Sequence, residues 1–428
     1  LSPMMEQYFR IKEQHKDHIL FYRLGDFYEM FYDDAILASK ELELTLTGRD
    51  CGQEERAPMC GVPYHSCEGY IARLIKKGYK VAICEQMEDP RLAKGVVKRE
   101  VIRVVTPGTL VETSMLDEGQ NNFIASICPE GEQYGLAVAD ISTGEIHAAQ
   151  FTDPDDSTLK NELSRFAPNE IVFHPAFLDK KEMAEFIRNR LSCCAECLRE
   201  EQYDFSEAQR RVLEQFGKSD LSELSLDQRP LAVQAIGGLL DYLTETQMNG
   251  VDRLVSLDLY SESQFMALDL TARRNLELTE TMRTGEKKGT LLWVLDRTRT
   301  AMGKRLIRQY VEQPLLSPAV IGRRLDAVDE LYQDTMLRDT VRERLGGIYD
   351  MERLMTKIVF GNCTPRDMRT FGAAIAALPA LRSCLEGTKS RFLREIEPEY
   401  IEETRSPVLE QRSRLGGWGS GYGSDTVP

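Results

Sequence analysis

In the first quarter of the chain, continuous apolar runs typical of strands alternate with apolar residues at the spacing of a helix. Ile19–Leu24 is a short apolar and aromatic run that predicts a strand, and Gly25–Asp26 interrupts it. After this break, the spacing of Phe27 and Phe31 predicts a helix that continues to about Leu42. Strand and helix patterns therefore alternate from the start of the chain.

The same alternation continues as far as residue 115. Tyr70–Lys77 has helical spacing and is followed by Gly78, which predicts a helix that ends there. Lys80–Cys84 and Val101–Val105 are apolar runs that predict two further strands. Residues 1–115 are therefore predicted to form one α/β domain.

Residues 119–245 predict a second α/β domain. Tyr134–Ile141 and Glu145–Phe151 flank Ser142–Gly144, a three-residue loop whose glycine suits a hairpin. Glu170–Phe173 is another predicted strand. Helices are predicted near Thr158–Phe166, Lys181–Leu191 and Arg229–Tyr242.

From about Phe265 the pattern is almost entirely helical. Ser317–Pro318 and Thr364–Pro365 each place a hydroxyl residue before proline, which is typical of a helix start. We expect a helical domain over residues 250–410. Residues 411–428 form a Gly-rich tail with linker composition.

Composition excludes several classes of protein. The 428 residues are 42% hydrophobic and 29% charged, which is ordinary for a soluble globular protein. No apolar run is long enough to span a membrane, and no signal peptide is visible at the N-terminus. The ten cysteines follow no framework pattern, so we expect reduced thiols and a cytoplasmic location.

The net charge of −15 argues against a general nucleic-acid coat protein, but the acidic excess lies mainly after residue 115. Within residues 71–103, basic residues outnumber acidic ones, so an anionic partner is expected to meet this part. A solvated charged surface is the alternative. The basic residues here are Arg73, Lys76, Lys77, Lys80, Arg91, Lys94, Lys98, Arg99 and Arg103.

Familiar catalytic motifs are missing from the sequence. It contains no phosphate loop, no H-E-x-x-H and no G-x-S-x-G. Cys193, Cys194 and Cys197 supply only half of a zinc site. Asp140 and Glu145 are candidates for a two-metal nuclease, but surface carboxylates beside a turn are the favoured interpretation because no third ligand is evident.

Residues Leu24–Phe31 allow two interpretations. In the first, Asp26 caps a helix, Glu29 completes a capping box, and Phe27 lies in the core. In the second, Phe27 is an exposed aromatic wedge that enters a DNA duplex, and Glu29 accepts a hydrogen bond from a base edge. The residue pattern alone favours the first.

A series of ordered motifs runs along the chain from about Met4 to about Leu385. The motifs are Phe21–Ala35, Pro58–His65, Lys80–Gln86, Val104–Thr109, Arg273–Glu277, Leu295–Thr298, Met302–Leu306, Asp350–Leu354 and Thr364–Asp367. Together they resemble the MutS family of DNA mismatch-recognition proteins. The resemblance favours base contact by Glu29, with Phe27 stacking on a mispaired or unpaired base.

The resemblance implies an α/β mismatch-binding domain, then an α/β ribonuclease H-like connector domain without nuclease activity, then an all-α partial core and lever domain. The clamp and the ATPase of the family are not recognisable, so we expect a C-terminally truncated member that is not an enzyme. It would need no cofactor, whereas full-length members use ATP and Mg²⁺.

The expected partner is duplex DNA with a mismatch or a small loop, in a bacterial, nucleoid-associated setting. Family members dimerise and act with a MutL-type partner, while an interaction module without mismatch binding is the alternative for this chain. From charge, the candidate phosphate contacts are Arg49, Lys76, Lys77, Lys80, Lys94, Lys98 and Arg99.

Overall fold

The computed structural model describes residues 2–395 except 53, 90, 92–94 and 249. The described residues divide into two compact units. The first contains the chain up to Pro314 together with Tyr349–Phe371, and the second contains Leu315–Ile348 and the residues from Gly372 onward. The candidate contact Lys94 and the predicted tail at 411–428 lie outside the described residues.

The first sheet has six strands in the order β3-β4-β2-β1-β5-β6. Strands β1 and β5 are parallel, and the other neighbours are antiparallel. The strands are β1 (Ile19–Leu24), β2 (Phe27–Phe31), β3 (Thr47–Arg49), β4 (Ala57–Pro63), β5 (Val81–Gln86) and β6 (Arg99–Val105).

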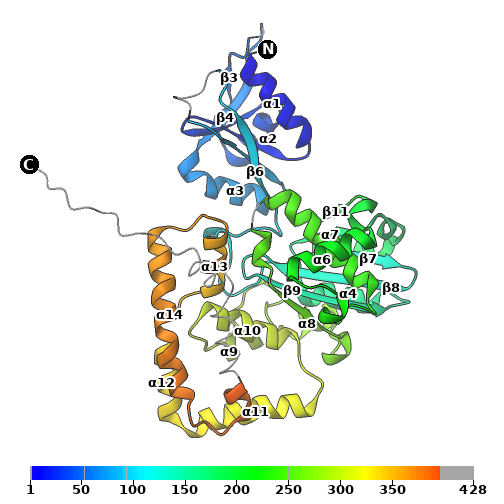
Figure 1. The fold of residues 1–428 in the computed structure, drawn as a ribbon, viewed down its shortest axis with the longest axis vertical. Coiled ribbons are helices and arrows are strands. Elements are labelled where there is room, and N and C mark those ends of the chain that lie inside the picture. Colours follow the sequence, from blue (N-terminus) through cyan, green and yellow to red (C-terminus); the bar gives the residue numbers. More distant parts are fainter. Residues whose placement is uncertain (1, 53, 90, 92–94, 249, 396–428) are drawn as a thin grey trace, which may run out of the picture. The chain divides into compact units, whose positions relative to one another are not determined.

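Helices cover both faces of this sheet (Figure 1). On one face, Met5 and Tyr8 of α1 (Pro3–Gln14) are buried against Tyr22 and Phe31. On the other face, α2 (Tyr32–Leu42) and α3 (Cys67–Lys76) pack on the alternate side chains of β1 and β2.

The helix predicted from Phe27 to Leu42 is wrong in its first part. Residues Phe27–Phe31 form strand β2, and the helix begins only at Tyr32. Gly25 and Asp26 form a two-residue hairpin loop rather than a helix cap, and Gly25 has φ +59°. The capping-box interpretation of Asp26 and Glu29 therefore fails.

The second sheet also has six strands, in the order β11-β10-β7-β8-β9-β12. Strands β7, β8 and β9 are antiparallel neighbours, whereas β10, β11 and β12 are added in parallel. The strands are β7 (Ile124–Glu130), β8 (Gln133–Asp140), β9 (Glu145–Thr152), β10 (Glu170–Phe173), β11 (Cys194–Cys197) and β12 (Ser256–Leu259).

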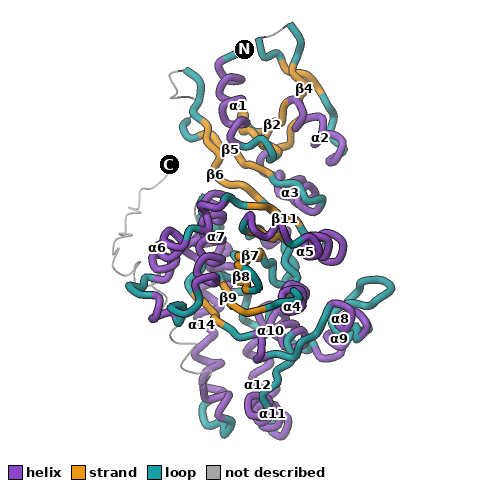
Figure 2. The backbone as a smooth tube through the Cα atoms, turned by 90° about the vertical axis from the view of Figure 1, so that its right-hand side faces the viewer, coloured by secondary structure: helices purple, strands orange, loops and turns teal. Residues whose placement is uncertain are grey.

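Two layers of helices enclose this sheet (Figure 2). One face packs against α6 (Phe205–Phe216) and α7 (Pro230–Gln247). The other face packs against α4 (Ser157–Phe166) and α5 (Lys181–Phe186), which continues as a π-helical turn over Ile187–Leu191. Both layers bury alternate residues of the same strands, as expected for a sheet covered on both sides.

A buried carboxylate joins the two sheets. Glu170 in β10 is fully buried, and its Oε1 accepts hydrogen bonds from Tyr242 (2.5 Å) and from Lys80 of the first domain (3.0 Å). Its Oε2 accepts hydrogen bonds from the hydroxyl of Thr106 (2.5 Å) and the backbone N–H of Gly108 (3.0 Å). The connection between the two sheets is therefore held by a buried polar network.

The described remainder is helical, as the pattern predicted. Thr300 caps its helix by accepting a hydrogen bond from the N–H of Gly303 (2.9 Å). No helix in the described part of the chain is long and apolar enough to cross a membrane. The helices are α8 (Leu270–Asn275), α9 (Leu291–Leu295), α10 (Ala301–Glu312), α11 (Pro318–Gln333), α12 (Thr335–Leu345), α13 (Met351–Val359) and α14 (Pro365–Leu385).

Candidate nucleic-acid interface

The hairpin of β1 and β2 presents Phe27 to solvent. Phe27 is the first residue after the turn and pairs with Leu24 on β1 and Pro63 on β4. Its side chain is 46% exposed, whereas the next residue, Tyr28, points into the core between the sheet and its helices. A large aromatic ring thus projects from the end of a well-supported strand.

Glu29 lies two residues further along the same strand, so its side chain shares the face of Phe27. Its carboxylate forms an ion pair with Arg49 on the edge strand β3. The Glu29 side chain is only 14% exposed. The aromatic ring and the acceptor predicted to meet one base are therefore neighbours on one surface.

Further contacts brace this hairpin from the opposite face. The hydroxyl of Tyr28 donates to Glu85, and Arg23 pairs with the same carboxylate at 3.4 Å. The guanidinium of Arg23 also lies 3.5 Å from the ring centroid of Tyr64, a cation–π contact. The strand that carries Phe27 is thus held by polar as well as apolar contacts.

The predicted phosphate contacts do not form one cluster. Arg49 lies on β3 and Arg99 on β6, which are opposite edges of the sheet. Lys76 is an exposed residue at the end of α3, and Lys77 pairs with Glu41. In a separate place, exposed Lys98 pairs with Glu100 at 2.6 Å.

Two of these candidate phosphate contacts instead form ion pairs or hydrogen bonds within the protein. Lys80 pairs with Glu170 in the network between the two sheets. Arg99 is buried, and it donates to the carbonyl oxygens of Arg23 (2.7 Å) and Val97 (2.9 Å). Both cations therefore have their partners within the protein and hold its structure together.

Asp140 and Glu145 face each other across the β8–β9 hairpin, but Asp140 is not the surface carboxylate that we predicted. Asp140 is fully buried and accepts hydrogen bonds from Asn121 (2.9 Å), the N–H of Asn122 (3.0 Å) and Ser142 (2.7 Å). Burial, and then the charge of Glu145, raises the pKa of Asp140. The carboxylate oxygens of Asp140 therefore accept hydrogen bonds that hold the surrounding chain in place.

Neither candidate metal site gains a ligand set from the fold. Among the described residues, no three histidine, cysteine or acidic side chains are placed to hold a metal ion. Cys194 and Cys197 lie in edge strand β11, where burial raises the pKa of both thiols. The metal-dependent nuclease therefore has no support in the described part.

His147 lies on β9, in the hairpin of β8 and β9, and is placed between two carboxylates. It is 2.8 Å from Asp258 and 3.0 Å from Glu145. Burial opposes protonation of the ring, but the hydrogen bonds to Asp258 and Glu145 prevail and raise the pKa of His147 to about 9. The protonated ring thus stabilises the folded chain.

We expect this stabilisation to depend on pH. Because the pKa of His147 is higher in the folded chain than the 6.5 of a free histidine, its contribution is complete below pH 6.5 and is lost as the pH rises toward 9. Melting temperatures of wild type and His147→Gln should differ most near pH 6 and converge by about pH 9. A constant difference across this range would contradict the assignment.

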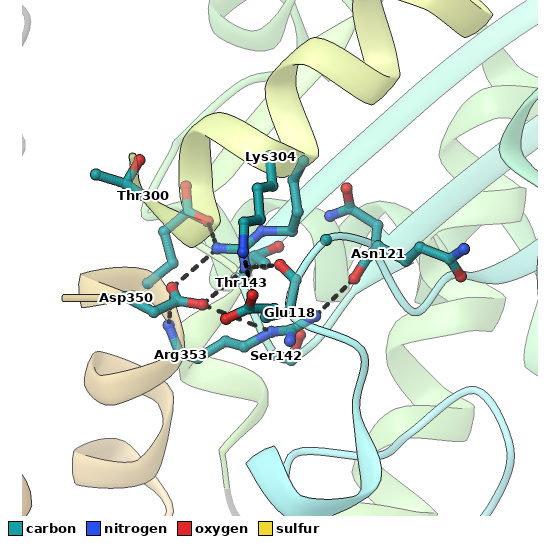
Figure 3. Close-up of polar contacts among 12 residues, drawn as sticks. Glu118, Asn121, Ser142, Thr143, Thr300, Lys304, Asp350 and Arg353 are labelled. Atoms are coloured by element: carbon teal, nitrogen blue, oxygen red, sulfur yellow. Dashed lines mark hydrogen bonds and ion pairs between the residues drawn. The ribbon is translucent and has the colours of Figure 1, made fainter. Parts of the chain in front are cut away.

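Polar contacts link the segment that precedes strand β7, residues 117–120, to the helical region (Figure 3). Arg305 in α10 forms a two-pronged pair with Asp350 at 2.7 and 2.9 Å. Arg353 in α13 donates to the carbonyl oxygens of Asp117 and Gln120, both at 2.7 Å. This cluster has a structural role, since its charged side chains are paired with one another or with backbone carbonyl oxygens.

Comparison with known proteins identifies three successive regions. Residues 2–114 match the model of MutS domain I, residues 122–258 that of MutS domain II, and residues 271–415 that of MutS domain III. Among similar curated proteins, the DNA mismatch repair protein MutS of Lachnoclostridium phytofermentans is 47% identical over 399 residues, 93% of this chain and 43% of that protein. The MutS proteins of Ruminiclostridium cellulolyticum and Acetivibrio thermocellus are also 47% identical, over 92% and 91% of this chain and 45% of each relative.

Two sheet-containing regions and a helical region, matched in order by domains of one family, define a multidomain protein of the DNA mismatch repair class. The chain belongs to the MutS family. It spans less than half the length of the curated relatives named above.

The sequence interpretation named Phe27, Glu29 and Arg49 but missed how the last two are related. It treated Arg49 only as a phosphate contact, whereas the structure pairs it with Glu29. It also missed Gly61, which lies directly opposite Glu29 on β4. The available signal was the glycine in the Pro58–His65 motif.

Proposed function

We propose that this chain recognises mispaired or unpaired bases in duplex DNA. Phe27 is the wedge that stacks on the base, and Glu29 accepts a hydrogen bond from the edge of that base. The observation that carries the proposal is the exposed ring of Phe27 beside Glu29 on one face of a braced strand. Family membership supports mismatch recognition in general terms.

The physical basis is the lower cost of deforming a defective base pair. A mismatch stacks poorly, so unstacking and kinking it cost less than deforming a matched pair, and specificity arises with few base contacts. Stacking of an aromatic side chain on the displaced base contributes about 1–3 kcal/mol. Phe27 is suited to this because its strand neighbours hold the backbone while the ring stays open to solvent.

We also propose roles for the remaining parts. Exposed Lys76 and Lys98 are the better-placed candidates for phosphate contact. Three antiparallel strands followed by parallel strands support a ribonuclease H-like connector, which we propose acts without nuclease chemistry. We propose that the 428-residue chain itself is not an enzyme. For longer family members we propose dimerisation, a MutL-type partner and the use of ATP with Mg²⁺.

Binding to defined duplexes tests the proposal. We expect wild type to prefer a duplex with a G·T mismatch or an unpaired T over a matched duplex at the same salt concentration. Phe27→Ala should lose about 5- to 150-fold of that preference, which is the range given by the stacking energy. Phe205→Ala is the matched control, since Phe205 is a similarly exposed phenylalanine (38%) in α6.

Fluorescence anisotropy at fixed ionic strength measures the two affinities, and circular dichroism checks that each variant is folded. A folded wild type that binds both duplexes equally would contradict the proposal. Binding to partner proteins without any preference for defective DNA would instead favour an interaction module.

A further inference from the structure

Three adjacent strands meet at the Glu29 carboxylate. Glu29 lies on β2, its cross-strand neighbour on β4 is Gly61, and Arg49 lies on β3 beyond β4. The ion pair between Glu29 and Arg49 therefore extends across the middle strand. The sequence separates these three positions, and only the strand order β3-β4-β2 brings them together.

Gly61 leaves the space that this arrangement uses. A β-carbon at position 61 would lie 3.5 Å from Cγ of Glu29 and 3.3 Å from the carbonyl oxygen of Tyr28. The second distance is tighter than an ordinary van der Waals contact. Without a side chain at Gly61, the Glu29 side chain can lie close over the middle strand.

The ion pair occupies only one of the two carboxylate oxygens. Nη1 of Arg49 contacts Oε2 of Glu29, and no hydrogen bond from the described residues reaches Oε1. An ionised carboxylate only accepts hydrogen bonds, so Oε1 remains suited to an N–H donor. The imino or amino group on the edge of a base is such a donor.

The positive charge of Arg49 has a second effect, on the repulsion between Glu29 and DNA. A carboxylate brought near DNA is repelled by the phosphates, because the duplex carries a dense negative charge. A guanidinium held against that carboxylate offsets the repulsion where the base must be contacted. Arg49 supplies this charge from within the protein, so it does not need to touch a phosphate.

We propose that Arg49 is a positioning residue for mismatch recognition, which fixes the Glu29 carboxylate so that Oε1 meets an N–H donor on a displaced base. This inference rests on the proposed function of Phe27 and Glu29. It replaces the sequence-based expectation that Arg49 contacts phosphate. The two roles differ in their effects, because a phosphate contact strengthens binding to every duplex alike.

The test compares five variants on a duplex with an unpaired T and on its matched counterpart. Arg49→Gln should reduce the preference for the defect roughly tenfold, the usual scale for losing a hydrogen bond to a charged group, and change matched-duplex affinity little. Arg49→Lys should restore part of the preference. Arg56→Gln is the control, because it removes the same charge from an exposed arginine next to β4.

The last two variants are Glu29→Gln alone and Glu29→Gln combined with Arg49→Gln. If Arg49 acts through Glu29, the double variant should keep the same preference as Glu29→Gln alone, within about twofold. Equal losses on both duplexes, a smaller salt dependence and additive effects would make Arg49 a phosphate contact and overturn the inference. A wild type without any preference would overturn the proposed function and this inference together, whereas a preference that Arg49→Gln leaves intact would overturn only the inference.

Discussion

Replacing Glu170 by glutamine is expected to lower the free energy of unfolding by about 3 kcal/mol, the lower end of the range for breaking a buried ion pair. The carboxylate is fully buried and accepts hydrogen bonds from Lys80, Tyr242, Thr106 and the N–H of Gly108. Glutamine keeps the size of the side chain but removes the charge and leaves the lysine with less compensation. The loss stays near the lower end because the lysine also pairs with a second carboxylate.

That second carboxylate provides the matched control. Glu196 also pairs with Lys80, but its side chain is 44% exposed. Exposed ion pairs contribute about 0–1 kcal/mol, so Glu196→Gln should change the stability by less than about 1 kcal/mol. Urea unfolding followed by far-ultraviolet circular dichroism measures both variants. Similar losses in the two variants would show that burial of Glu170 does not decide its contribution.

Gly135→Ala is expected to cost about 3 kcal/mol, or to prevent folding, because strand β8 lies against the start of α7. A β-carbon at position 135 would lie 2.0 Å from the carbonyl oxygen of Leu231 and 2.8 Å from the nitrogen of Ala232. Both atoms belong to the backbone, so no side-chain rotation relieves the overlap. Overpacking of this kind typically costs about 1–3 kcal/mol, occasionally more.

Gly69→Ala is the comparison for this substitution. Gly69 lies in α3, where a β-carbon would meet no atom within 4 Å. Alanine is favoured over glycine in a helix by about 0.5–1 kcal/mol, so this variant should be neutral or more stable. Thermal unfolding of both variants measures the difference. A Gly135→Ala chain that melts within 2 °C of wild type, roughly the shift from less than 1 kcal/mol, would contradict the close packing of β8 and α7.

Strands with continuous apolar character were predictable from the sequence. The bounds of Ile19–Leu24 and Glu170–Phe173 agree with the structure, because both strands are buried between layers of helices and need apolar residues. The expected hairpin between β8 and β9 is present with Gly144 at φ +81°, although its loop is Ile141–Gly144, one residue longer than the predicted Ser142–Gly144. The edge strands β3, β11 and β12 were missed because edge strands need no apolar run. The interior strands β4 and β7 were missed as well, and both contain proline, which weakens the strand pattern in the sequence.

Strand β2 shows how two periods can compete in one segment. Phe27 and Phe31 have the spacing of a helix face, but Tyr28 and Met30 alternate with Phe27 and Glu29 as in a half-buried strand. The turn at Gly25 decided between them, since a hairpin returns the chain to pair with β1. Five residues supply too few turns for periodicity to decide alone.

The candidate site was predictable only in its residue types. Phe27 and Glu29 are two residues apart, so their common face follows from the strand once it is recognised. The contact of Glu29 with Arg49 requires strand β4 between them, and local sequence does not encode strand order. In the same way, the burial of Lys80 depends on Glu170, which lies 90 residues later and in another domain.

The network around Glu170 affects how this family segment can be recombined. Domain boundaries drawn along the sequence separate the first two regions near residue 115, yet Lys80 has its partner in the second. Arg103 likewise donates to Gln247 at 2.9 Å and is itself buried. In a chimera whose first domain comes from another protein, Glu170 and Gln247 of the second domain would lose their partners Lys80 and Arg103. Both residues of each pair must therefore be transferred together.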